Sequence, residues 1–165
     1  MIEWADWTET DGVALRLVAS RTGLQRVEFH PIARTVGESN PSHPLLQESV
    51  RQLSFYFAGK LREFDIPLEF EGTEFQRRVW HSLTQIPYGA TRSYGELAAT
   101  IGAPTAVRAV GAANGANPLA IVVPCHRVIG TNGKLVGYGG GLPLKKRLLE
   151  LERLTLGDDL PLLNQ

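Results

Sequence analysis

Hydrophobic and polar residues alternate in two segments near the start of the chain. Residues 13–19 and 24–30 both show this period of two, and Ser20 to Gly23 supplies turn-forming residues between them. A β-strand with one buried face has the same period, because successive side chains point to opposite sides. The pattern predicts a β-hairpin.

A helical period follows a loop at residues 31–44 that contains three prolines. Apolar residues then recur every three or four positions, at Leu45, Leu46, Val50, Leu53 and Phe57. This spacing predicts a helix, and Gly59 suits the position just past its end. A short strand is expected over residues 66–70, at a sheet edge because Pro67 has no N–H. Residues 1–71 are therefore predicted to form a small structural α/β domain.

Helical patterns dominate residues 72–165, which are predicted to form a second domain. Thr73 to Gln76 is a capping box with an apolar stripe behind it, and Ser93 to Glu96 is another. The second box opens a helix to about Ile101, and Pro104 suits the first turn of a further helix that ends near Asn114. Two short helices joined by a glycine-containing turn predict a helix-turn-helix.

Asn132-Gly133 is a strong hairpin signal between residues 128–131 and 134–138. A helix-turn-helix followed by a hairpin predicts a winged-helix-like domain, so the fold class expected for the whole chain is α+β. The last helix begins at Pro143. Glu152 lies near its apolar side, where a carboxylate is costly unless it is paired. A surface ion pair with Lys145 is as good an interpretation of Glu152 as a buried role.

Composition and charge narrow the function only modestly. No apolar run approaches the ~18 residues of a membrane span, and the acidic N-terminus does not resemble a signal peptide. The net charge is zero, but residues 1–71 carry 7 basic and 11 acidic side chains, whereas residues 72–165 carry 10 and 6. This asymmetry permits a DNA-binding second half. A single cysteine fits a reducing compartment, with a cytoplasmic protein as the default.

That cysteine, Cys125, follows a β-branched run at residues 121–123. The run predicts a buried strand that Pro124 stops, so that the sulfur lies at a strand end. A lone cysteine is most often a small buried hydrophobic residue. His126 and Arg127 favour a reactive thiolate instead, since positive neighbours lower the pKa of a thiol.

The segment Pro124-Cys125-His126-Arg127-Val128 resembles the active-site signature of the O6-alkylguanine-DNA alkyltransferases, also called methylated-DNA–protein-cysteine methyltransferases. The resemblance covers roughly residues 72–154 and is weak before them. It extends over Tyr88-Gly89, Tyr94-Gly95-Glu96-Leu97-Ala98, Arg108-Ala109-Val110-Gly111, Asn117-Pro118 and Gly137-Tyr138-Gly139-Gly140-Gly141.

The resemblance implies DNA repair by direct damage reversal. Cys125 would attack the alkyl carbon of O6-alkylguanine, and of O4-alkylthymine, in a single irreversible turnover without metal or cofactor. Adjacent side chains diverge, so a direct bond between the Cys125 thiol and the His126 ring is not expected. A bridging water and a bond from Glu152 to the far ring nitrogen would complete the relay, as in the family.

The family also implies how the base is bound. Tyr94 would donate to ring nitrogen N3, the Gly139 N–H would face O6, and the Cys125 and Val128 carbonyls would accept from the exocyclic amine. Tyr138 is expected as a pocket wall, although the glycines beside it also fit a flexible linker. Asn117 would tether the helix-turn-helix to the active-site segment.

The expected partner is double-stranded DNA that carries alkylated bases, with cooperative self-association left open and no membrane. Apart from Arg108, residues 105–113 are mostly small, which fits either close helix packing or sequence-neutral binding in the minor groove. The family favours the second interpretation, with Arg108 replacing the flipped nucleotide and with Ser93 and Thr131 as further DNA contacts. Family members with an N-terminal zinc site bind the metal through cysteine and histidine side chains. This chain has only Cys125, so no metal is expected.

Two rival functions remain at this point. A cysteine–histidine hydrolase would need a direct thiol–imidazole pair and an oxyanion hole. A non-catalytic, lesion-binding relative would replace the cysteine, usually with tryptophan, and Cys125 argues against it.

Overall fold

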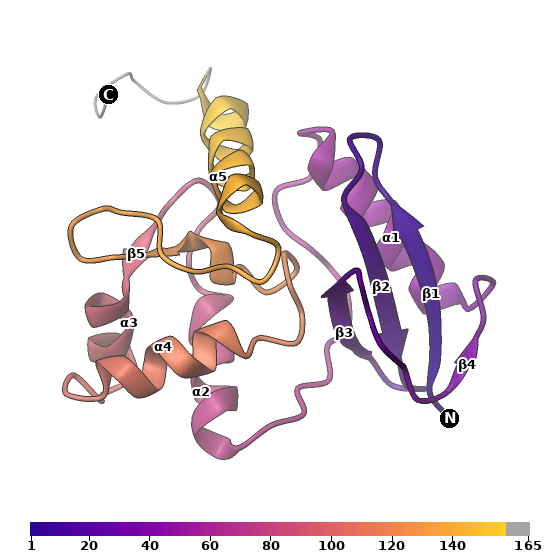
Figure 1. Cartoon of the computed structure of the whole chain (residues 1–165), viewed down its shortest axis with the longest axis horizontal. Coiled ribbons are helices and arrows are strands. Elements are labelled where there is room, and N and C mark those ends of the chain that lie inside the picture. Colours follow the sequence, from indigo (N-terminus) through magenta and orange to yellow (C-terminus); the bar gives the residue numbers. More distant parts are fainter. Residues whose placement is uncertain (158–165) are drawn as a thin grey trace.

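The first part of the chain forms a small, mostly antiparallel sheet. The structure, a computed structural model, describes residues 1–157. Its first sheet has the order β3-β2-β1-β4, in which only β4 runs parallel to its neighbour (Figure 1). The strands are β1 (Glu3–Thr8), β2 (Ala14–Ala19), β3 (Leu24–Phe29) and β4 (Glu38–Ser39). The predicted hairpin is confirmed as β2 and β3, whereas β1 and β4 were not predicted.

Helix α1 (Pro44–Phe57) covers one face of this sheet (Figure 1). Its inward side includes Leu46, Leu53 and Tyr56, all 0% exposed. The predicted helix is thus confirmed. The strand predicted over residues 66–70 is wrong, since only Leu68 makes a bridge, to Leu24 of β3. Pro67 has no N–H with which to extend that ladder.

The rest of the described chain is mainly helical, which confirms the α+β class. Its helices are α2 (Glu74–Leu83), α3 (Tyr94–Thr100), α4 (Val107–Gly115) and α5 (Leu142–Leu156). A 3-10 turn, η1 (Cys125–Arg127), precedes β6 (Val128–Ile129), which pairs in parallel with β5 (Arg92–Ser93). Helices α3 and α4 form the helix-turn-helix.

Side-chain caps fix where two of these helices begin. Thr73 Oγ1 accepts from the Gln76 N–H at 3.1 Å, and Ser93 Oγ accepts from the Glu96 N–H at 3.0 Å. Both predicted capping boxes are therefore confirmed. Helix α4 begins at Val107, later than predicted, because Pro104 lies in a preceding turn that the Ala106 N–H closes.

The hairpin predicted around Asn132-Gly133 is wrong. Gly133 occupies a turn with φ +79°, but residues 134–138 form no strand, and β6 pairs with β5 instead. The carbonyls of Val136 and Gly137 accept hydrogen bonds from Lys145 Nζ of α5, at 2.9 and 3.2 Å. The side chain of a buried lysine thus occupies backbone carbonyls that would otherwise accept hydrogen bonds from a neighbouring strand.

The strand predicted over residues 121–123 is also wrong, although these residues are buried. They form a tight turn in which the Val123 N–H bonds the Leu119 carbonyl at 2.9 Å. Ile121 has φ +71°, a strained conformation for a β-branched residue. Asn117 closes the turn, since its Nδ2 donates to the Val123 carbonyl and its Oδ1 accepts from the Leu119 N–H.

Strand β3 joins the sheet to the helical part. The Val27 N–H bonds the Pro118 carbonyl at 2.8 Å, and the Ala120 N–H bonds the Val27 carbonyl at 3.2 Å. Figure 1 shows β3 at the side of the sheet that faces the helices. The segment leading to Cys125 is thus attached to the first sheet. Within residues 1–157, none of the helices has the length and apolar character to cross a membrane.

Candidate active site

Cys125 lies at the start of η1, on the wall of a cavity of about 750 Å³. The cavity is bounded by β3, by Tyr94 of α3, by Gly111 and Asn114 of α4, and by residues 136–139. It therefore extends from the helix-turn-helix to the only cysteine. Cys125 itself is 8% exposed.

Burial raises the pKa of the Cys125 thiol above its usual value, and a hydrogen bond from Asn117 and the charge of Lys145 offset part of that rise. The lowered pKa expected from the sequence is therefore wrong. Arg127, which was expected to help lower it, bonds elsewhere: its Nη1 donates to the Ile86 carbonyl at 2.7 Å. The sulfur is a thiol at neutral pH and needs a base.

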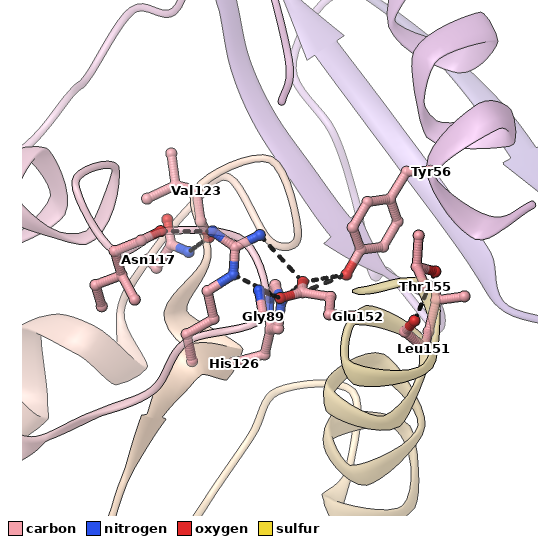
Figure 2. A network of polar contacts seen from close by, with 10 residues as sticks. Tyr56, Gly89, Asn117, Val123, His126, Leu151, Glu152 and Thr155 are labelled. Atoms are coloured by element: carbon pink, nitrogen blue, oxygen red, sulfur yellow. Dashed lines mark hydrogen bonds and ion pairs between the residues drawn. The ribbon is translucent and has the colours of Figure 1, made fainter. Parts of the chain in front are cut away.

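His126 lies next to Cys125 and pairs with Glu152 of α5. Its Nε2 is 2.7 Å from Glu152 Oε2, and both side chains are 0% exposed (Figure 2). Burial lowers the pKa of His126, so the ring is neutral at neutral pH. A neutral imidazole that faces a carboxylate donates from Nε2, which leaves Nδ1 with a lone pair.

His126 Nδ1 is buried and has no hydrogen-bond partner among the described residues. Among residues 1–157, no hydrogen bond joins the His126 ring to the Cys125 sulfur. The adjacent residues thus do not form a direct thiol–imidazole pair. A proton can pass between them only through a third group.

Five hydrogen bonds hold the Glu152 carboxylate. Besides His126, Arg127 donates from Nε at 2.8 Å and from Nη2 at 3.1 Å. The Gly89 N–H donates at 3.0 Å, and the Tyr56 hydroxyl donates at 2.6 Å. Burial acts to raise the pKa of Glu152, but the bonds from His126 and Arg127 outweigh it and lower the pKa to about 2.

The interpretation of Glu152 as part of a surface ion pair with Lys145 is therefore wrong. Glu152 pairs with His126 and Arg127 in the interior, and Lys145 is itself 0% exposed. Lys145 lies on the same helical face as Leu148 and Glu152. This spacing is the sequence signal that could have revealed the burial of Lys145. Nothing in the sequence pointed to Tyr56, which lies 96 positions from Glu152.

Several other predicted site residues line the same cavity. Tyr94, Asn117, Tyr138 and Gly139 are all at its wall. The Tyr94 hydroxyl donates to the Val136 carbonyl at 3.3 Å, which ties α3 to the loop before α5. Val128 is 0% exposed in β6 and is not part of the cavity wall.

The predicted DNA contacts lie outside the cavity. Arg108 is exposed on α4, and Thr131 is exposed in the loop after β6. Ser93 is half-buried at the start of α3, where its hydroxyl is already used as the helix cap. Within residues 1–157, no group of three or more potential ligand side chains could hold a metal ion.

Fold and site together define a helix-turn-helix protein with a candidate nucleophilic cysteine. Residues 14–70 match the family model of the 6-O-methylguanine DNA methyltransferase ribonuclease-like domain, and residues 74–154 match that of the DNA binding domain. The chain belongs to the methylated-DNA–protein-cysteine methyltransferase family.

Individual relatives agree with this assignment. A methylated-DNA–protein-cysteine methyltransferase from Mycolicibacterium paratuberculosis is 55% identical, with 93% of each chain covered. Another from Methanosarcina acetivorans is 62% identical over 82% of this chain and 89% of its own. A crystal structure of Mycobacterium tuberculosis OGT in complex with DNA is 50% identical, covers 93% of this chain and 94% of its own, and has a TM-score of 0.86.

Proposed function

We propose that this protein repairs DNA by moving the alkyl group of O6-alkylguanine, and of O4-alkylthymine, onto Cys125. The observation that carries the proposal is the position of the thiol. It lies on the wall of the cavity that reaches α4, with the buried His126–Glu152 pair behind it. The cavity volume of about 750 Å³ is within the range of small-molecule sites.

The reaction is a direct displacement at the alkyl carbon. A bond forms between sulfur and that carbon as the bond from the carbon to O6 breaks. The thiol proton passes through a bridging water to the lone pair of His126 Nδ1, and the departing guanine takes up one proton from water. The His126 imidazolium then returns its proton to water, so no net proton is gained or lost. Glu152 stabilises the positive charge that His126 acquires.

Residues at the cavity wall would bind the base. The Tyr94 hydroxyl, which donates to the Val136 carbonyl in the structure, would turn to donate to ring nitrogen N3. The Gly139 N–H would face O6, and the Tyr138 ring would form a wall. Asn117 supports the reacting segment through its two bonds to the turn before Cys125. Charge builds on guanine as it leaves, and these donors oppose that charge.

Binding to duplex DNA would deliver the base. The small residues of α4 allow close approach to the minor groove, with Arg108 filling the space of the nucleotide that rotates into the cavity. Ser93 and Thr131 would contact the backbone nearby. The thioether product has no route back to a thiol, so each molecule acts once.

The proposal includes a division of labour along the chain. Residues 1–71 form a structural domain, and residues 72–165 carry DNA binding and chemistry, although the last eight lie outside the described residues. A reactive thiol without a disulfide partner suits a reducing compartment such as the cytoplasm.

Intact-mass measurement after incubation with duplex DNA containing O6-methylguanine tests this function. The expected result is a gain of one methylene mass per molecule, on the peptide that contains Cys125, with no turnover. C125S should still bind the damaged duplex and should gain no mass. An unchanged mass of the unaltered protein, or an alkyl group on another residue, would overturn the proposal.

A further inference from the structure

One hydroxyl group from the first sheet-and-helix part of the molecule reaches the polar network of the site. Tyr56 lies in α1 and is 0% exposed, and its Oη is 2.6 Å from Glu152 Oε2 (Figure 2). We propose that Tyr56 is a positioning residue for alkyl transfer, whose hydroxyl holds the Glu152 carboxylate in place for His126. The inference rests on the proposed function.

The direction of this hydrogen bond is fixed by the two groups. Glu152 is ionised, so its oxygens only accept. Burial raises the pKa of Tyr56 well above its usual value, so the phenol keeps its proton at every pH at which the protein works. The hydroxyl is therefore a permanent donor to the carboxylate.

Tyr56 donates to the same oxygen as the histidine. Glu152 Oε2 accepts from His126 Nε2 at 2.7 Å and from the Tyr56 hydroxyl at 2.6 Å. The Tyr56 oxygen is also 3.4 Å from His126 Nε2, so the three groups are in mutual contact. Its loss would leave Oε2 with fewer donors and its charge less dispersed.

Two consequences follow for His126. A carboxylate oxygen with one donor fewer attracts the proton of the imidazolium more strongly, so the pKa of His126 should rise. The carboxylate would also be less firmly held, and the ring would lose part of its orientation. The loss of orientation slows the reaction at every pH, and the higher pKa slows it further at low pH, where a larger fraction of the ring is protonated.

The other charged and titratable groups around His126 do not replace this contact. Arg127 of η1 and Lys145 of α5 both lower the pKa of His126 through their charge. Tyr138 packs its ring edge-on against the imidazole at 6.4 Å, and its hydroxyl has no hydrogen-bond partner among the described residues. Besides His126 and Arg127, only Tyr56 donates to Glu152 through a side chain within residues 1–157.

The alternative is that Tyr56 only fills space. Its ring does pack against other aromatic rings, including Phe64 at 5.4 Å and Tyr88 at 6.2 Å between centroids. Phenylalanine would preserve those contacts and remove only the hydroxyl. Tyr88 offers a matched control, because its hydroxyl is buried nearby and has no hydrogen-bond partner in the described chain.

The experiment compares Y56F and Y88F with the unaltered protein. Single-turnover alkyl transfer is followed from pH 5 to pH 9 with duplex O6-methylguanine and with the free base O6-benzylguanine. Y56F should be slower by about tenfold on both probes, as expected for a lost hydrogen bond to a charged group. Its acid limb should lie at higher pH, while its affinity for DNA should be unchanged.

Y88F should match the unaltered protein in rate and pH profile. If Y56F shows the unaltered acid limb, or if Y88F is slowed equally, Tyr56 is not a positioning residue. A thermal melt of each variant separates a folding defect from these outcomes, because lower stability alone does not move the acid limb. If the unaltered protein gains no alkyl group, the proposed function itself fails instead.

Discussion

Three buried ionisable side chains lie near Cys125, and their hydrogen-bond partners are of two kinds. His126 and Glu152 pair with each other, whereas Lys145 donates to two backbone carbonyls. All three are 0% exposed. A buried charge is tolerated only when it is paired and hydrogen-bonded, so these contacts are conditions of folding as well as of chemistry.

The pKa values of Glu152 and His126 predict that acid destabilises the protein. Both are lowered in the folded state, so each group contributes stability at high pH that is lost as pH falls. For His126 the loss begins below its ordinary value of 6.5. For Glu152 it runs from 4.5 to about 2 and corresponds to about 3 kcal/mol.

Urea unfolding at pH 7 and pH 3 measures this effect. E152Q should be less stable than the unaltered protein at pH 7 but should lose less stability between the two pH values. E150Q changes an exposed carboxylate on the same helix and should retain the full pH dependence. Equal acid sensitivity in E152Q and the unaltered protein would contradict the prediction.

The hydrogen bonds of Lys145 predict an effect on both stability and alkyl transfer. K145M keeps much of the side-chain volume but removes the Lys145 donor from the Gly137 carbonyl, and it leaves the Val136 carbonyl with the longer bond from the Tyr94 hydroxyl alone. The expected loss is about 1–3 kcal/mol of unfolding free energy, together with slower alkyl transfer because these residues form the cavity wall. K146M, at a side chain that is 69% exposed, should change neither by a comparable amount.

Among the secondary-structure elements, α4 is the one whose surface bears most directly on DNA binding. Arg108 is its only long charged side chain and is exposed. If it replaces the flipped nucleotide, R108A should slow repair of duplex O6-methylguanine by about tenfold or more, since flipping costs a few kcal/mol. Transfer from free O6-benzylguanine, which needs no flipping, should be nearly unchanged.

R21A provides the matched control for Arg108. It removes the same charge from the exposed turn between β2 and β3. Single-turnover rates on both probes should then remain close to those of the unaltered protein. Equal losses of R108A on duplex and free base would exclude its role as a wedge.

Elements with local signals could be predicted from the sequence, and elements that depend on distant partners could not. The capping boxes at Thr73 and Ser93 fix helix starts through groups three residues apart, so their signal is local. The apolar run at residues 121–123 is buried as expected, but Asn117 folds it into a turn rather than a strand. Lys145 similarly removes the acceptors of the expected hairpin.

The same distinction applies to the whole molecule and its site. The sequence motif placed Cys125 and His126 together and suggested Glu152, because the chemistry requires a partner for the imidazole. It could not place Tyr56, because only the fold brings this side chain of α1 within hydrogen-bond distance of Glu152 in α5 (Figure 2). Nor could it show that burial would raise rather than lower the pKa of the Cys125 thiol.

The turn between β1 and β2 also contacts α5, through an ion-pair cluster of Arg147 with Glu9 and Asp11. Arg147 of α5 donates to Glu9 at 2.8 Å and to Asp11 at 3.0 Å. The Glu9 side chain is 4% exposed, whereas that of Asp11 is 72% exposed. A hydrogen bond from Arg147 lowers the pKa of Glu9, so the carboxylate remains ionised at neutral pH.

Burial should decide which of these two pairs stabilises the molecule. A double-mutant cycle of R147M with E9Q should give a coupling of about 1–3 kcal/mol, because solvent does not screen the buried carboxylate. The cycle of R147M with D11N should give less than about 0.5 kcal/mol, as for exposed ion pairs. Both couplings are measured by urea unfolding at pH 7. Equal couplings would show that contact distance, rather than burial, sets the strength of this link between the ends of the chain.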